Sequence, residues 1–83
     1  MTKEDKRFAR LATNPKNVKF RDFVAVIESC GFVLAKQTGS HRRYKHPAVR
    51  DRHLVIQPRG GMAKPYQVGQ FLEMVAEYHL RDE

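Results

Sequence analysis

Residues 32–57 read FVLAKQTGSHRRYKHPAVRDRHLVIQ, and three parts of this stretch have the composition of β-strands. The predicted strands are residues 32–37, 41–46 and 53–57. The polar and small residues at 38–40 and 47–51 are typical of turns. Strands joined by short turns form an antiparallel meander, so the stretch predicts a three-stranded antiparallel sheet.

The middle strand alternates in the sense of a sheet with two different faces. His41, Arg43 and Lys45 share one face, and Arg42, Tyr44 and His46 share the other. In the last strand Leu54 and Ile56 share a face. One face of the sheet is therefore expected to meet the core.

Two helices are predicted before the strands in the sequence, and one helix after them. Residues 3–13 form a short amphipathic helix, which Asn14-Pro15 ends. A second helix runs from about 20 to 30, with Gly31 as the left-handed residue after it, and a third begins at Pro65. The order α-α-β-β-β-α predicts an α+β fold with the helices on one face of the sheet. A ligand would lie on the open face.

Length and composition limit the classes of protein. The chain has 83 residues, so a single domain, 1–83, is expected. Lysine and arginine number 16 and acids 9, a net charge of +7, which favours a polyanionic partner such as RNA, DNA or an acidic protein.

Cys30 is the only cysteine, and the four histidines lack a ligand spacing, so neither an internal disulfide nor a metal cofactor is predicted. The longest apolar run, residues 23–27, is far too short to span a membrane, and the charged start of the chain carries no export signal. We expect a reducing cytoplasm and no membrane partner.

Basic residues concentrate between residues 42 and 64, where Asp51 is the only acid. Cations neutralise phosphates, which favours a nucleic-acid-binding face. The candidates are Arg42, Arg43, Lys45, Arg59 and Lys64, with Tyr44 interleaved. Tyr44 has two equally weighted interpretations, a ring that stacks on RNA or a core ring. Arg59 opens an RGG segment that more often forms an ordinary turn than a phosphate site.

His41 is the candidate for chemistry because it follows the Gly39-Ser40 turn and shares a face with Arg43 and Lys45. Cleavage of RNA without a metal needs a base for the 2′-hydroxyl, an acid for the leaving oxygen, and cations for the charge that develops on the phosphate. Histidine can fill either proton role near neutral pH. From the residues alone, a histidine that only contacts the ligand is the more common case.

The pattern GFVLAKQTGSHRRYKHP (31–47), then HLVIQPRGG (53–61) and KPYQV (64–68), resembles the HicA family of bacterial toxins. The resemblance covers roughly residues 16–80, which leaves 1–15 as an N-terminal helical extension of a core at 16–83. It implies a double-stranded-RNA-binding-domain-like fold and a ribosome-independent mRNA interferase without a metal cofactor. It also implies His41 as the catalytic histidine and a HicB-type antitoxin that covers the active face. The chain is expected to be a monomer alone and a hetero-oligomer with its antitoxin in the bacterial cytoplasm.

Three positions depart from the family pattern. Arg42 stands where many members have a second histidine, Arg43 where an apolar residue is common, and Arg59 where a histidine often lies near the glycines. No second proton-transfer residue is therefore carried over from the family. Two alternatives stay open: a non-catalytic RNA-binding domain of the same fold, and a protein-interaction module whose basic face binds only an acidic partner.

Overall fold

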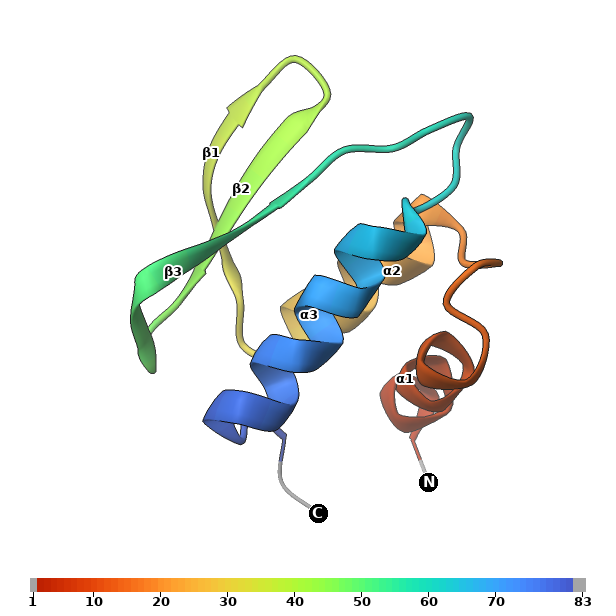
Figure 1. The fold of residues 1–83 in the computed structure, drawn as a ribbon, viewed down its shortest axis with the longest axis horizontal. Helices are drawn as coiled ribbons and strands as arrows, with labels where there is room; N and C mark the ends of the chain where they lie inside the picture. Colours follow the sequence, from red (N-terminus) through yellow and green to blue (C-terminus); the bar gives the residue numbers. More distant parts are fainter. Residues whose placement is uncertain (1, 82–83) are drawn as a thin grey trace.

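A computed structural model describes residues 2–81, and its elements follow the order α-α-β-β-β-α (Figure 1). The fold class is confirmed as α+β. The elements are α1 (Lys3–Thr13), α2 (Phe20–Ser29), β1 (Val33–Thr38), β2 (His41–His46), β3 (Val49–Ile56) and α3 (Pro65–Tyr78).

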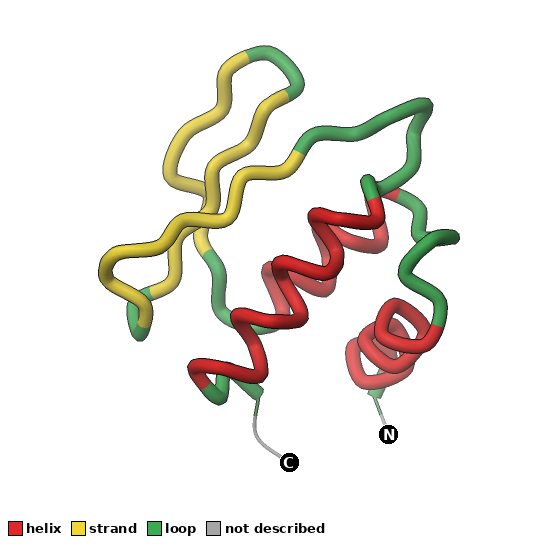
Figure 2. Tube along the Cα trace, in the orientation of Figure 1, coloured by secondary structure: helices red, strands yellow, loops and turns green. Residues whose placement is uncertain are grey.

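The three strands form one antiparallel sheet in the order β1-β2-β3 (Figure 2). Helices α2 and α3 lie side by side against one face of this sheet, and α1 lies on their far side (Figure 1). Strand β1 forms an edge, and every one of its residues is exposed. The other face of the sheet is open, as the sequence predicted.

Aromatic and aliphatic side chains from the sheet and all three helices meet in one core. Phe71 of α3 lies at its centre, because its ring has edge-on or tilted contacts with Phe8, Phe23 and Phe32 at centroid distances of 5.8–6.2 Å. From the sheet, Tyr44, Leu54 and Ile56 are fully buried against the helices. This core holds β2 in a fixed orientation.

Helix α1 is held to the rest of the molecule by burial and by one ion pair. It begins with a capping box, in which Thr2 and Asp5 each accept a backbone N–H of the other. Leu11 is 1% exposed, and Phe8 contacts Phe71. Arg81 then donates to Asp5 at 2.6 Å, with its guanidinium 3.9 Å from the centroid of the Phe8 ring. The end of the described chain therefore clamps the start of α1.

Two boundaries differ from the sequence-based prediction. Residues 47–51 were expected to form the second turn, but the turn is only Pro47-Ala48 and β3 already begins at Val49. The polar run Arg50-Asp51-Arg52 lies in the strand, because its neighbours Val49 and Leu54 reach the core. Helix α2 ends at Ser29, and Gly31 adopts the expected positive φ, at 94°.

No helix in the described part of the chain is long and apolar enough to cross a membrane.

Candidate active site

The β1–β2 hairpin sets the position of His41. Its two-residue turn is Gly39-Ser40, with Gly39 at a φ of 59°, a conformation that favours glycine. The turn pairs Thr38 with His41 and then Lys36 with Arg43 across the two strands. These four side chains therefore lie on the same face of the hairpin.

A bulge in β1 changes the pairing of the two strands, so these four side chains share a face only at the end of the hairpin near its turn. The register shifts between Leu34 and Lys36, so that Leu34 pairs with the buried Tyr44 whereas Lys36 pairs with the exposed Arg43. The extra residue is Ala35. Lys36 is thereby placed on the open face, opposite Arg43.

A shallow depression of about 220 Å³ lies on this face of the sheet. Its lining combines one histidine, two cations, a hydroxyl and an apolar wall: His41, Lys36, Arg43, Thr38 and Val55. All five residues are exposed, and none is acidic. A phosphodiester could therefore contact His41 and both cations together.

His41 and Arg43 are brought together as the sequence predicted. Lys45 follows Arg43 by two residues on β2 and is also exposed, but it lies outside the lining of the depression. Within residues 2–81, no three His, Cys, Asp or Glu side chains are grouped as metal ligands would be.

Lys64 is connected to the turn that precedes His41. Its Nζ donates to Oε1 of Gln57 at 3.5 Å, and Nε2 of Gln57 donates to the hydroxyl of Ser40 at 3.3 Å. The backbone N–H of Gln57 donates to the buried Gln67 at 3.0 Å, which holds Gln57 in place. A cation at the start of α3 is thus linked through one side chain to the His41 turn.

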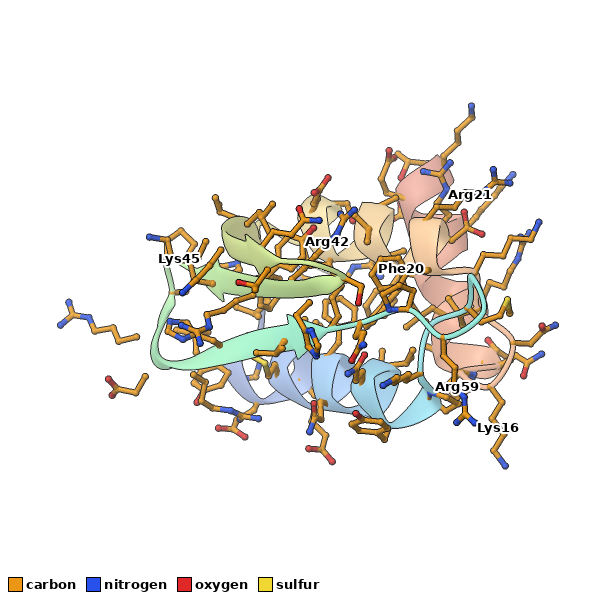
Figure 3. The ribbon with its side chains drawn as sticks, turned by 90° about the horizontal axis from the view of Figure 1, so that it is seen from above. Lys16, Phe20, Arg21, Arg42, Lys45 and Arg59 are labelled. Atoms are coloured by element: carbon orange, nitrogen blue, oxygen red, sulfur yellow. The ribbon has the colours of Figure 1, made fainter. Side chains whose placement is uncertain are left out.

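Arg42 lies on the side of β2 that faces the helices. Its guanidinium lies 5.6 Å from the centroid of the Phe20 ring, and Nη1 donates to the Tyr44 hydroxyl at 3.5 Å. Arg42 is half-buried, so part of it stays accessible at the edge of the sheet near the start of α2 (Figure 3). It does not share the depression with His41.

Tyr44 does not belong to an RNA-binding surface. Its side chain is 0% exposed, and its hydroxyl donates to Glu28 at 3.2 Å. Burial, as the largest effect, raises the pKa of this phenol. The ring is therefore not accessible to a base, and the prediction that it stacks on RNA is wrong. The other interpretation, a core ring, is confirmed.

The remaining histidines of the sheet have different surroundings. Nδ1 of His46 accepts the Ala48 N–H at 3.0 Å, so its Nε2 carries the proton and donates to the Cys30 carbonyl at 2.9 Å. His46 is thus a structural link between β2 and the end of α2. His53 is exposed and precedes Val55 by two residues on β3, outside the lining of the depression.

Arg59 lies in the loop between β3 and α3. The Gly61 carbonyl of this loop accepts the Phe20 N–H at 3.0 Å, and the Ala63 N–H donates to Val18 at 2.8 Å, so the loop is tied to the start of α2. Arg59 is exposed and lies at the opposite end of the molecule from Lys45 (Figure 3). These two predicted contacts are therefore not part of one cluster.

A family model described as HicA toxin of bacterial toxin-antitoxin matches residues 20–75, which is more than half of the chain. The chain belongs to the HicA toxin family. It is therefore the toxin of a toxin–antitoxin pair and has an antitoxin as its partner. The match includes every strand and the His41 depression, whereas α1 lies before it. No curated protein and no solved structure matches the chain.

Sequence reasoning missed Lys36 and Thr38 of this HicA-family chain. The signal was present, because a two-residue turn at Gly39-Ser40 determines the pairs on either side of it. Counting outward from that turn pairs His41 with Thr38 and Arg43 with Lys36, as the structure has them.

Proposed function

We propose that this toxin is an mRNA interferase that cleaves RNA without a metal and that His41 is its catalytic residue. The main support for this proposal is the depression that His41, Arg43 and Lys36 line together. A proton-transfer group and two cations are the parts that cleavage of a phosphodiester by its own 2′-hydroxyl requires.

In the proposed reaction the 2′-oxygen attacks phosphorus and the bond to the 5′-oxygen breaks. His41 takes the proton of the 2′-hydroxyl or supplies one to the departing 5′-oxygen, and water makes the other proton transfer. Arg43 and Lys36 stabilise the negative charge that builds on the non-bridging oxygens, because cationic donors act strongest where charge develops. The products are a 2′,3′-cyclic phosphate and a 5′-hydroxyl.

The protein surface around the depression gives RNA further cationic contacts. Lys45 continues the open face along β2, and Lys64 is linked to the Ser40 turn. Arg42 and Arg59 extend the cationic surface around the edge of the sheet toward α2 (Figure 3). We assign these four residues to backbone contacts with RNA, which weaken as salt rises.

The antitoxin would be of the HicB type and would cover the open face, so that the free toxin is a monomer and the inhibited toxin a hetero-oligomer in the bacterial cytoplasm. The same surface also supports the alternative of a non-catalytic RNA-binding domain. The two functions differ in one respect: only the enzyme produces cleavage products that depend on His41.

The deciding experiment compares the wild type with His41→Ala on a labelled RNA. We expect the rate of cleavage to fall by about 10²- to 10⁴-fold, the usual contribution of one positioned proton-transfer group, while RNA affinity changes little. His53→Ala, a second exposed histidine on the sheet, is the matched control and should retain cleavage. EDTA should have no effect, and a 2′-deoxy sugar at the cleaved position should block the reaction.

Undiminished cleavage by His41→Ala would refute the assignment of this residue. RNA binding with no cleavage product from the wild type would favour the non-catalytic alternative.

A further inference from the structure

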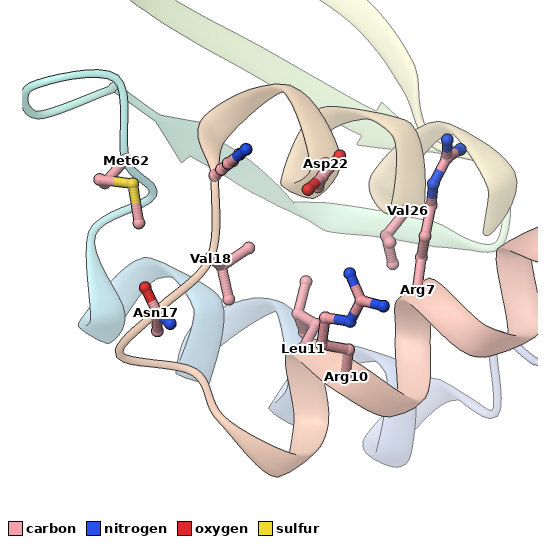
Figure 4. Close-up of a pocket in the computed structure, with 9 residues that line it drawn as sticks. Arg7, Arg10, Leu11, Asn17, Val18, Asp22, Val26 and Met62 are labelled. Atoms are coloured by element: carbon pink, nitrogen blue, oxygen red, sulfur yellow. The ribbon is translucent and has the colours of Figure 1, made fainter.

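A cavity lies between α1 and the start of α2, away from the sheet (Figure 4). Its volume is about 340 Å³, within the range of pockets that hold ligands. Leu11, Val18 and Val26 form an aliphatic floor, and all three are buried. The cavity can therefore accept an apolar side chain at little cost in desolvation.

The rim of this cavity is cationic. Arg7 and Arg10 extend from α1 toward α2 (Figure 4), and Lys19 lies at the start of α2. The ion pairs within residues 2–81 are Arg52–Glu77 and Arg81–Asp5, so the three rim cations have no acidic partner within 4 Å in that part of the chain. Among the described residues of the lining, Asp22 is the only acid, so the cavity has an excess of positive charge.

We propose that this cavity binds an acidic segment of a partner protein. An aliphatic side chain of the segment enters between α1 and α2 and contacts the floor, while neighbouring carboxylates accept hydrogen bonds from Arg7 and Arg10. Arginine suits this role because its guanidinium binds carboxylates with two parallel hydrogen bonds.

RNA fits the cavity less well than a peptide. Single-stranded bases are usually held by stacking on aromatic rings, and none of the described residues that line the cavity is aromatic. The cavity is lined by α1 and α2, whereas the depression that contains His41 is on the sheet. Helix α1 lies on the far side of α2 and α3 from the sheet (Figure 1). A protein segment could therefore occupy it without meeting RNA at the depression.

The proposal does not follow from membership of the family. Most of the lining, including Arg7, Arg10 and Leu11, precedes residue 20, where the family match begins. It also does not rest on RNA cleavage by His41, so either can fail without the other.

The test titrates the full-length, ¹⁵N-labelled protein with the blocked peptide acetyl-Glu-Leu-Asp-Leu-Glu-amide and follows the amide and methyl resonances by NMR. We expect saturable shifts centred on Leu11, Val18 and Val26. Affinity should fall as salt rises from about 50 to about 200 mM, because the contacts at the rim are ionic. The neutral peptide with Gln and Asn in place of the acids should bind at least tenfold more weakly.

Four variants test whether the peptide binds in the cavity or is attracted only by the positive charge of the protein as a whole. Arg10→Ala should weaken the peptide about tenfold, whereas Lys6→Ala, on α1 but outside the lining, should not. Asn17→Phe, which fills the mouth without changing the charge, should also weaken it. Asp22→Asn removes the opposing carboxylate and should strengthen binding.

Three results would overturn the proposal. The first is an absence of saturable shifts at the floor residues. The second is equal loss of affinity in Arg10→Ala and Lys6→Ala. The third is a single-stranded RNA of about ten nucleotides that perturbs the floor residues more strongly than the peptide, because the cavity would then be a nucleic-acid site.

Discussion

Replacing Gly31 with alanine should destabilise the protein for two separate reasons. Gly31 has a φ of 94°, which side-chain-bearing residues rarely adopt. A Cβ built there would lie 2.9 Å from Nε2 of His46, the atom that donates to the Cys30 carbonyl. The added methyl group therefore strains the backbone and displaces the histidine that links β2 to α2.

The two effects can be estimated separately. A non-glycine residue in the left-handed region costs about 1–2 kcal/mol, and loss of the His46–Cys30 hydrogen bond costs about 1 kcal/mol. The sum, about 2–3 kcal/mol, corresponds to a fall in Tm of roughly 10–20 °C for a domain of this length. Urea unfolding followed by circular dichroism gives the free energy directly.

Gly69→Ala is the matched control within the same chain. Gly69 lies inside α3, and an added Cβ meets nothing within 4 Å, so alanine should stabilise the protein by about 0.5–1 kcal/mol through helix propensity. Replacement of glycine by alanine is thus expected to lower the free energy of unfolding at Gly31 and to raise it at Gly69.

The contribution of His46 is separated by a double-mutant cycle. In a His46→Ala background, Gly31→Ala should cost only the backbone term, about 1 kcal/mol less than in the wild type. An equal cost in both backgrounds would show that the contact with His46 is irrelevant, and a neutral Gly31→Ala would refute the whole argument.

Three further predictions concern single side chains. Lys36→Ala should slow RNA cleavage about tenfold or more, since a hydrogen bond to a charged group is worth about 1.5 kcal/mol, whereas Gln37→Ala beside it should not. Tyr44→Phe should lower the unfolding free energy by about 1 kcal/mol through loss of the bonds that its hydroxyl makes with Glu28 and Arg42, with RNA cleavage unchanged; an unchanged free energy of unfolding would contradict this. The Thr2 N–H, with Arg81, holds the pKa of Asp5 below its usual value, so the stability this carboxylate adds is present above its unfolded pKa and is lost as the pH falls. Asp5→Asn should therefore make the urea midpoint less sensitive to acid, and an unchanged profile between about pH 6 and pH 3 would contradict this.

The helices and the arrangement of the sheet were predictable because each rests on a local signal. Asn14-Pro15 ends α1, Gly31 follows α2 with a positive φ, and Pro65 begins α3. The alternation along β2 correctly separated the exposed His41 side from the side that contains Tyr44. The division into an extension at 1–15 and a core at 16–83 stays a prediction.

The errors arose where tertiary packing decides the outcome. Nothing local distinguishes a tyrosine that stacks on RNA from one that fills a core, and the burial of Tyr44 depends on α2 and its Glu28. The early start of β3 likewise depends on Val49 reaching the core, against the turn-forming composition around it. The residues next to Tyr44 and Val49 in the sequence give no sign of either contact.

The cavity beside α1 could not be predicted from the sequence at all. Its lining comes from two consecutive helices and the segment between them, residues 7–26, and from Met62, which is distant along the chain. Only the packing of α1 against the other helices brings Arg7, Arg10 and Asp22 around one volume.

Strand β2 has one side that packs against the helices and one side that faces solvent. Tyr44 and His46 are held by contacts with the helices, whereas His41, Arg43 and Lys45 contribute nothing to the core. Mutations on the exposed side should therefore alter what the toxin recognises without lowering its ability to fold. On the function proposed above, a lineage of such toxins could change its RNA preference, or escape one antitoxin and acquire another, by substitutions at every second residue of a single strand.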